Sequence, residues 1–181
     1  MPASENFPNQ TINILRQQQI KISDPDIIAT TGWTTSDLSG ALTAVPPRHT
    51  YSFVSLLIGV NNQYQGRSID EYNSEFTLLV RSAINYAGNR NNKVYVLSIP
   101  DYSVTAFSRN LDTSKIAREI DSYNVLNKTI ATQLGVNYLD ITQISREAKN
   151  NPSFTAIDGL HPSGIQYKKW ADLLALMITQ G

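Results

Sequence analysis

The sequence contains no cysteine, which excludes disulfide bonds, thiol nucleophiles and cysteine-ligated metal sites. With two histidines and no dense carboxylate cluster, it also argues against a dedicated transition-metal site. The 15 basic side chains balance the 15 acidic ones, without the basic stripe that a nucleic-acid partner would require. No stretch approaches the roughly 18 apolar residues of a membrane span. The first residues do not resemble a signal peptide, so the compartment is left open between cytoplasm and export.

The order of apolar segments indicates an α/β fold. A length of 181 residues suits one ordinary domain that spans positions 1–181. Short apolar runs, which are typical of strands, occupy residues 26–30, 53–58, 94–99 and 137–139. Apolar residues at three- and four-residue steps, which are typical of helices, occupy 12–15, 69–83 and 116–134. This alternation predicts right-handed βαβ units and a mainly parallel sheet.

The loops after the predicted strands carry the chemically informative residues. In open parallel sheets, ligands bind outside the carboxyl ends of the strands. Gly32 follows the first predicted strand, Asn61 the second and Asp101 the third. A glycine N–H and an asparagine amide are suitable hydrogen-bond donors for a developing oxyanion. Thr31-Gly32 and Asn61-Asn62 would each fit a plain turn, but their order along the chain favours an acyl-transfer site.

The segment 158–162, Asp-Gly-Leu-His-Pro, places a carboxylate three positions before an imidazole. Pro162 fits the first position of the helix predicted by the apolar spacing that follows it. A carboxylate and a histidine on a loop can form the base and orienting half of a hydrolytic triad. The same residues would also fit a helix cap beside a surface histidine. His49, in the connector 44–49, is expected to be an ordinary exposed side chain.

Together these motifs resemble those of the SGNH hydrolases, also called the GDSL lipase/esterase family, over essentially the whole chain. Gly32 is similar to the glycine of the family's second block. The run 59–62, Gly-Val-Asn-Asn, resembles the third block, usually G-x-N-D, with Asn62 in place of the aspartate. Asp158 and His161 resemble the D-x-x-H of the fifth block.

The resemblance implies a three-layer α/β/α sandwich of flavodoxin-like type, with a mainly parallel five-stranded sheet. It implies hydrolysis of small-molecule, lipid or glycan esters without a cofactor or metal. In that reading His161 is the general base, Asp158 orients it, and Asn61 and Gly32 donate to the oxyanion. Three aromatic residues are candidates for the substrate pocket, or for plain packing: Trp33, Tyr64 and Tyr102.

One part of the family pattern is missing. The first block, G-D-S-[LY], carries the nucleophilic serine at the end of the first strand, and this sequence contains no such block. Residues 2–8 resemble the segment that follows it, so the chain is expected to be N-terminally truncated and to lack the first strand. Ser4 does not replace the nucleophile, since it follows no strand and no Gly-Asp. The serines expected to serve in caps or turns are Ser36, Ser98, Ser103 and Ser163.

The prediction is therefore a serine ester hydrolase scaffold that is inactive because the segment with the nucleophile is absent: a lipase or esterase, of lysophospholipase or acetyl esterase type. A non-catalytic glycan- or acyl-binding pseudoenzyme is the alternative, favoured by the missing serine and opposed by Asp158 and His161. A flavodoxin-like cofactor binder would need a phosphate-cradling loop after the first strand, and none is visible. The sequence does not name the ester, the acyl length or the oligomeric state.

Overall fold

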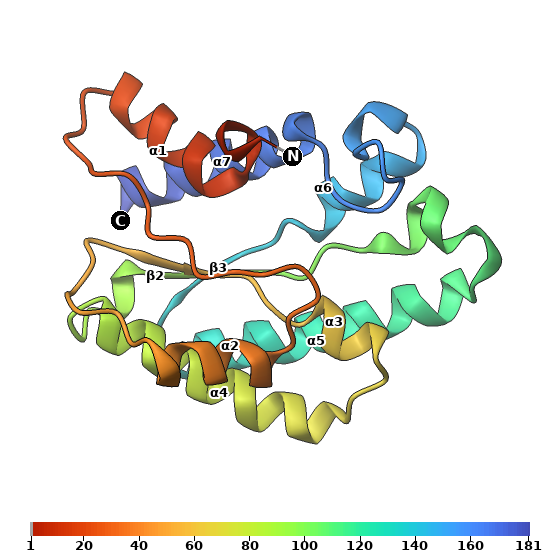
Figure 1. Ribbon diagram of the computed structural model, residues 1–181, viewed down its shortest axis with the longest axis horizontal. Coiled ribbons are helices and arrows are strands. Elements are labelled where there is room, and N and C mark those ends of the chain that lie inside the picture. The colour runs from red at the N-terminus through yellow and green to blue at the C-terminus, as the bar shows by residue number, and fades with distance from the viewer. Residues whose placement is uncertain (1) are drawn as a thin grey trace. The chain divides into compact units, whose positions relative to one another are not determined.

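Helices and short parallel strands make up the computed structural model, which describes residues 2–181 (Figure 1). The strands are β1 (Val54–Leu56), β2 (Val94–Leu97) and β3 (Asn137–Leu139). The longer helices are α1 (Phe7–Gln17), α2 (Thr35–Ala44), α4 (Ile69–Tyr86), α5 (Thr113–Gln133) and α7 (Gly164–Gln180). The short α-helices are α3 (Val60–Tyr64) and α6 (Thr142–Arg146). The 3₁₀ helices are η1 (Ala3–Glu5), η2 (Asn91–Lys93), η3 (Tyr102–Val104), η4 (Ala106–Asn110), η5 (Glu147–Lys149) and η6 (Pro152–Phe154).

The described residues divide into two units by their contacts. Unit 1 combines residues from the first 27 positions with Pro100–Ala117 and Ile141–Gly181, and unit 2 combines Ile28–Ile99 with Arg118–Asp140. The helix α5 therefore contributes its first residues to unit 1 and the rest to unit 2. Along the chain, β1, α4, β2, α5 and β3 alternate as the sequence predicts, and the α/β fold class is confirmed.

The sheet belongs to unit 2 and, within residues 2–181, has three parallel strands in the order β1-β2-β3. Val54 pairs with Val94, and Val96 pairs with Tyr138. All residues of β2 are buried, as expected for a central parallel strand that is apolar on both faces. The strands predicted at 53–58 and 94–99 are confirmed in shorter form, and the one at 137–139 coincides with β3.

The helices of unit 2 gather on one side of its strands, where Figure 1 shows α2, α4 and the later part of α5. Tyr72 of α4 is fully buried and stacks on Phe76, with ring centroids 5.3 Å apart. Its hydroxyl donates to Asn127 Oδ1 at 2.8 Å. Burial raises the pKa of Tyr72 well above the usual value, so the hydroxyl keeps its hydrogen and remains a donor. This bond explains why a polar residue, Asn127, occupies an apolar position in the α5 pattern.

The strand predicted at residues 26–30 is wrong, because these residues form no regular element. Ile27 and Ile28 are 47% and 39% exposed, whereas the residues of β2 are buried. A strand persists only when its N–H and C=O groups find partners in a neighbouring strand. Among residues 2–181, no β-ladder joins this segment, or the outer edge of β1, to another strand.

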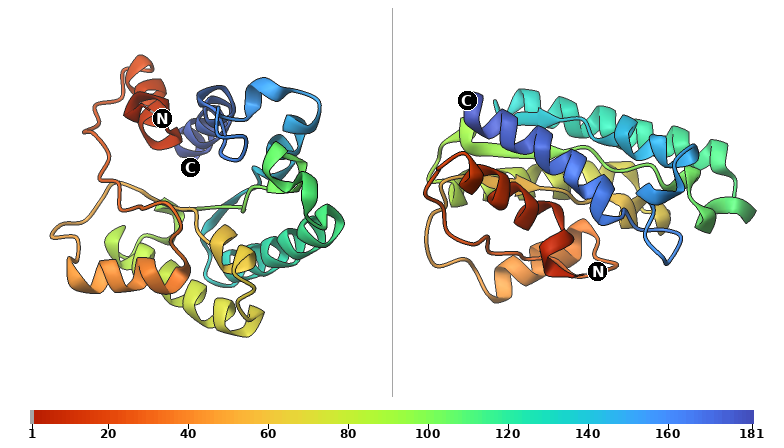
Figure 2. Two further views of the ribbon diagram at one scale, coloured as in Figure 1. Left: turned by 45° about the vertical axis from the view of Figure 1, so that its right-hand side comes forward. Right: turned by 90° about the horizontal axis from the view of Figure 1, so that it is seen from above.

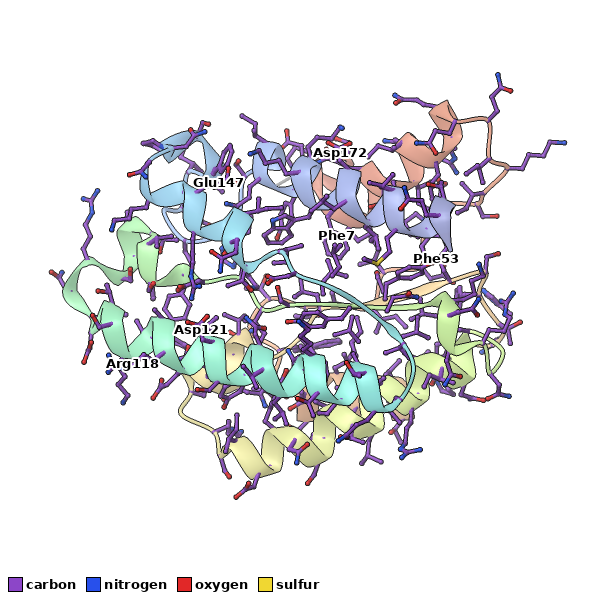
Figure 3. The ribbon with its side chains drawn as sticks, turned by 180° about the vertical axis from the view of Figure 1, so that it is seen from behind. Phe7, Phe53, Arg118, Asp121, Glu147 and Asp172 are labelled. Carbon is purple, nitrogen blue, oxygen red and sulfur yellow. The ribbon has the colours of Figure 1, made fainter. Side chains whose placement is uncertain are left out.

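Unit 1 is organised around α1 and α7, which run side by side in both views of Figure 2. Phe7, labelled in Figure 3, lies against α7 with its ring 6.2 Å from Tyr167 and 6.4 Å from Trp170. Trp170 is almost fully buried. The apolar spacing along residues 12–15, and that of the helix predicted after Pro162, is therefore confirmed as the contact between two helices.

The start of α7 differs from the prediction. Ser163 is the N-cap, and its hydroxyl accepts from the Gln166 N–H, so the helix begins at Gly164. Pro162 lies before the cap and not at the first helical position. It forms an isolated antiparallel bridge with Thr155 instead, and the hydrogen bonds of this bridge come from neighbouring residues: the Ser163 N–H donates to the Phe154 carbonyl at 2.8 Å, and the Ala156 N–H to the His161 carbonyl. The pairing therefore needs no N–H from the proline.

Candidate active site

A short hairpin in unit 1 carries Asp158 and His161. Its two sides meet at the Thr155–Pro162 bridge, and the Ala156 N–H donates to the His161 carbonyl at 2.7 Å. At the tip, the Gly159 N–H donates to the Ala156 carbonyl at 2.9 Å. Gly159 has a φ of +72°, a left-handed conformation that glycine adopts without strain. The chain thus turns back within a few residues and brings the carboxylate to the imidazole.

Asp158 serves two purposes with its two carboxylate oxygens. Oδ1 accepts from the N–H groups of Leu160 and His161, both at 2.9 Å. Oδ2 lies 2.7 Å from His161 Nδ1. Burial alone would raise the pKa of Asp158, but these N–H groups and the His161 ring lower it to about 2. The orienting contact is therefore present, whereas the helix cap that the sequence leaves as the alternative is not, because Ser163 caps α7 and the N–H groups bonded to Asp158 belong to its own hairpin.

The ionised carboxylate of Asp158 fixes the tautomer of His161. A carboxyl group with a pKa of about 2 is ionised at pH 7 and can only accept hydrogen bonds. His161 Nδ1 must then carry the hydrogen in this pair, and neutral His161 keeps its lone pair on Nε2. About half of each side chain is exposed. The pair can therefore take a proton at Nε2 from a reacting group and return it.

Backbone contacts attach this hairpin to η4. The Phe107 N–H donates to the Gly159 carbonyl at 3.0 Å, so a residue of η4 fixes the backbone directly after Asp158. A Cβ on Gly159 would lie 3.4 Å from the Ala106 Cβ, a close fit without free space. The position of the Asp158 and His161 pair thus depends on η4 as well as on the hairpin itself.

Two loops of unit 2 hold the predicted oxyanion donors. Gly32 is exposed, has a φ of +90° and lies in a turn that the Trp33 N–H closes onto the Thr30 carbonyl at 3.3 Å. The Asn61 amide, at the start of α3, donates to the Trp33 carbonyl at 3.0 Å. An asparagine amide has two N–H groups, so one can hold this turn while the other is available to a substrate.

Gly59, just before Asn61, allows the chain to leave the sheet in the required direction. Its φ is +126°, in the region that favours glycine. An added Cβ would come within 2.8 Å of both the Tyr72 ring and Ile99 Cδ1. The glycine therefore permits close packing under the loop that presents Asn61.

Asn62, which stands where the family usually has aspartate, connects this loop to α2. It is 1% exposed, its Oδ1 accepts from the Thr35 N–H at 3.0 Å, and its amide donates to Thr35 Oγ1 at 2.6 Å. The Thr35 hydroxyl in turn donates to Glu75 of α4. Thr35 and Glu75 were not predicted as site residues. The only sequence signal for this chain of hydrogen bonds is the N-cap pattern at Thr34, whose side chain forms a capping box with Asp37.

The other candidates from the sequence have ordinary structural settings. Asp101 is buried and bonds Arg146 Nε at 2.8 Å, which makes it an anchor of unit 1. Tyr102 is also buried and lies 6.3 Å from the ring of Phe107, so it packs in the interior. Tyr64 is 56% exposed and His49 lies at the surface, as expected for His49. Ser4 lies exposed in η1.

Two further findings concern ligands and membranes. Within residues 2–181 no group of three or more His, Asp or Glu side chains is arranged to hold a metal ion. Of the helices formed by these residues, none combines the length and apolar character needed to cross a membrane.

Solved structures of esterases share this fold. Axe2, an acetylxylan esterase from Geobacillus stearothermophilus, superposes with a TM-score of 0.72 at 20% identity, over 96% of this chain and 80% of that one. TesA gives a TM-score of 0.74 at 13% identity, over 99% and 91%. The psychrotrophic esterase EstA from Pseudoalteromonas sp. gives 0.62 at 15% identity, over 99% and 89%. At these identities the likeness establishes the fold.

The family itself is established by sequence. Curated protein sequences gave no significant match. The profile of the GDSL-like lipase/acylhydrolase family, in contrast, matches residues 4–169, which is nearly the whole chain. The chain therefore belongs to the GDSL-like lipase/acylhydrolase family and is by family a carboxylic ester hydrolase.

Proposed function

We propose that this protein is a serine ester hydrolase scaffold in which Asp158 and His161 move the proton. The observation that carries the proposal is the 2.7 Å contact between Asp158 Oδ2 and His161 Nδ1, which leaves His161 Nε2 as the base. Asp158 is the orienting group. Gly32 N–H and the Asn61 amide are the proposed donors to the oxyanion, and positions 1–181 act as one domain.

The proposed reaction follows the pattern of serine hydrolases. A serine Oγ attacks the ester carbonyl while His161 Nε2 accepts its proton, and the carbonyl oxygen becomes an oxyanion. Gly32 N–H and the second Asn61 N–H stabilise this charge. His161 then protonates the departing alcohol, which leaves an acyl-serine. A water gives its proton to Nε2 and attacks the acyl group, and His161 returns the proton to the serine as the acid is released.

The nucleophile in this proposal belongs to a Gly-Asp-Ser block, which the 181-residue sequence does not contain. Ser4 is unsuited to the task because it lies in a 3₁₀ helix and not at the end of a strand. Residues 1–181 alone should therefore hydrolyse esters hardly faster than water. Removal of the triad in a serine protease leaves a residual enhancement on the order of 10³ to 10⁴, and less is expected here.

The test compares two proteins: residues 1–181, and the same residues preceded by a family strand that ends in Gly-Asp-Ser, the extended protein. Both are assayed for p-nitrophenyl acetate hydrolysis and for labelling by a fluorophosphonate. We expect labelling of the added serine in the extended protein only. Stoichiometric labelling of any serine in residues 1–181 would instead mean that the chain contains its own nucleophile.

The substrate class is proposed from chemistry and from the structural relatives. One relative is described as an acetylxylan esterase, which supports an acetylated sugar as substrate. Lipid and lysophospholipid esters are the competing class in this family. Rates of the extended protein on acetylated oligosaccharides and on p-nitrophenyl esters of increasing acyl length separate the two.

A non-catalytic binding module on the same scaffold is the second candidate, and the missing Gly-Asp-Ser block favours it. In that case the extended protein would stay inactive although it folds. The chain of residues 1–181 would then bind an acetylated glycan or an acyl chain with the same affinity after His161→Ala. Catalytic use of His161 predicts activity in the extended protein that this substitution removes.

A further inference from the structure

A pocket within unit 1 lies beside the hairpin that carries Asp158. It has a volume of about 660 Å³, in the range of small-molecule sites. Its walls come from η3, η4, the start of α5, the stretch from η5 to η6, and the hairpin itself, which contributes Thr155, Ala156 and Gly159. Every wall belongs to the same unit. A ligand in this pocket would touch the backbone next to Asp158.

The charged groups of the pocket are basic. Arg109 and Lys149 line it, and among the residues that the structure describes no acidic side chain does. Neither cation forms an ion pair within residues 2–181. The acids nearest in sequence have other partners: Asp112 accepts from the Lys115 N–H at 2.8 Å, and Glu147 bonds Lys169 Nζ at 2.7 Å. Asp158, in the hairpin beside the pocket, bonds His161. Two positive charges therefore face the pocket without a counter-charge from the chain.

Hydroxyl groups make up much of the remaining lining. Those of Thr105 and Ser108 donate to backbone carbonyls and are occupied. Those of Thr113, Ser114 and Thr155 also line the pocket, and within residues 2–181 they form no hydrogen bond with the chain. Most of the other lining residues are small and apolar, among them Val104, Ala117 and Pro152. The free cations and hydroxyls still favour a polar, anionic ligand, because an acyl chain would leave them without partners.

We propose that this pocket binds an anionic group on the alcohol part of the substrate, namely the carboxylate of an acidic sugar or a phosphate. Arg109 and Lys149 bind the charge, and the free hydroxyls bind the polar atoms around it. The assignment to the alcohol part of the substrate rests on the proposed function, since the pocket adjoins the hairpin of Asp158 and His161. The binding of the anion itself does not depend on catalysis.

The test is a titration of ¹⁵N-labelled residues 1–181, followed by NMR shifts of the Thr155, Ala156 and Gly159 amides. The ligands are D-glucuronate, D-glucose and inorganic phosphate at constant ionic strength. Glucuronate and glucose differ only at C6, where a carboxylate replaces a hydroxymethyl group, so the pair isolates the contribution of charge. We expect saturable binding of an anion, and no saturable binding of glucose.

The double variant Arg109→Gln, Lys149→Gln should raise the Kd of the anion about tenfold, equivalent to one charge-assisted hydrogen bond. The matched control, Arg81→Gln with Lys128→Gln, removes two exposed charges from helices of unit 2 and should leave the Kd unchanged.

The ligand comparison identifies the anion. Phosphate binding without glucuronate binding would assign a phosphate, and glucuronate binding without phosphate binding would assign an acidic sugar. Equal binding of glucuronate and glucose, no saturable anion binding, or an unchanged Kd in the double variant would overturn the proposal. The NMR titration measures binding and needs no ester hydrolysis. An inactive extended protein would therefore count against the proposed function and not against the anion site.

Discussion

The hairpin of Asp158 is held by hydrogen bonds between residues close in sequence, whereas the loop of Asn61 and Asn62 is held by bonds to residues far away in sequence. The hairpin is half exposed, and the bonds of Asp158 go to residues two and three positions away. Asn62 is buried, and its bonds reach Thr35, 27 positions away. Glu75, which completes that chain of bonds, lies 40 positions from Thr35.

Because of this difference, the hairpin and the buried Asn62 should respond differently to substitution. A local, exposed pair can be altered with little effect on folding, because water replaces the lost hydrogen bonds. A buried polar group that loses its partner keeps the full cost of desolvation, typically about 1–3 kcal/mol. Substitutions in the hairpin should therefore change activity, and substitutions at Asn62 should change the free energy of unfolding.

The largest effect is expected for His161→Ala in the extended protein. Loss of the base removes proton transfer from the serine, so kcat/KM should fall by about 10³-fold or more. The melting temperature should stay near that of the parent, since the ring is half exposed. His49→Ala is the control and should keep full activity. Similar losses from both substitutions would show that His161 is not the base.

Next in size is Asn61→Ala, which tests the proposed oxyanion donor. Loss of one such donor costs roughly 2.7–4 kcal/mol, or about 10²- to 10³-fold in kcat, with little change in KM. Asn61 also holds the Trp33 carbonyl, which faces partly to solvent, so its loss should lower stability by no more than about 1 kcal/mol. Kinetics and urea unfolding of the same variant measure the two effects. A kcat within about threefold of the parent would make Asn61 a loop residue only.

The neighbouring substitution Asn62→Asp restores the family's usual residue and should destabilise this chain. Its Oδ1 could still accept from the Thr35 N–H, but no N–H would remain to donate to Thr35 Oγ1, whose hydrogen goes to Glu75. We expect a loss of about 1–3 kcal/mol at pH 7 in urea unfolding. A buried carboxyl near Glu75 would have a raised pKa in the folded state, so the loss should shrink as pH falls through that pKa. Equal stability of the two proteins at pH 7 would contradict this account of Asn62.

These contrasts also explain what the sequence could and could not predict. Apolar periodicity identified α4, α5, α7 and the buried β2 because it reflects packing along one element. It failed at 26–30, where strand formation depends on a partner elsewhere. The Asp158 and His161 contact was predictable because four consecutive residues contain it. The bonds of Asn62 with Thr35 and Glu75 were not, since nothing local links positions so far apart.

The smallest effect concerns the acid stability of the hairpin. The pKa of Asp158 is about 2 in the folded protein and about 3.8 when unperturbed, so the ionised carboxylate favours the folded state. That contribution is fully present above pH 4 and is lost as pH falls from about 4 to about 2. Because half of the side chain is exposed, the shift in melting temperature should be small. Asp158→Asn removes the titration, so the melting temperatures of parent and variant should differ above pH 4 and converge towards pH 2. A difference that stays constant over this range would mean that the Asp158 bonds do not stabilise the fold through the charge of the carboxylate.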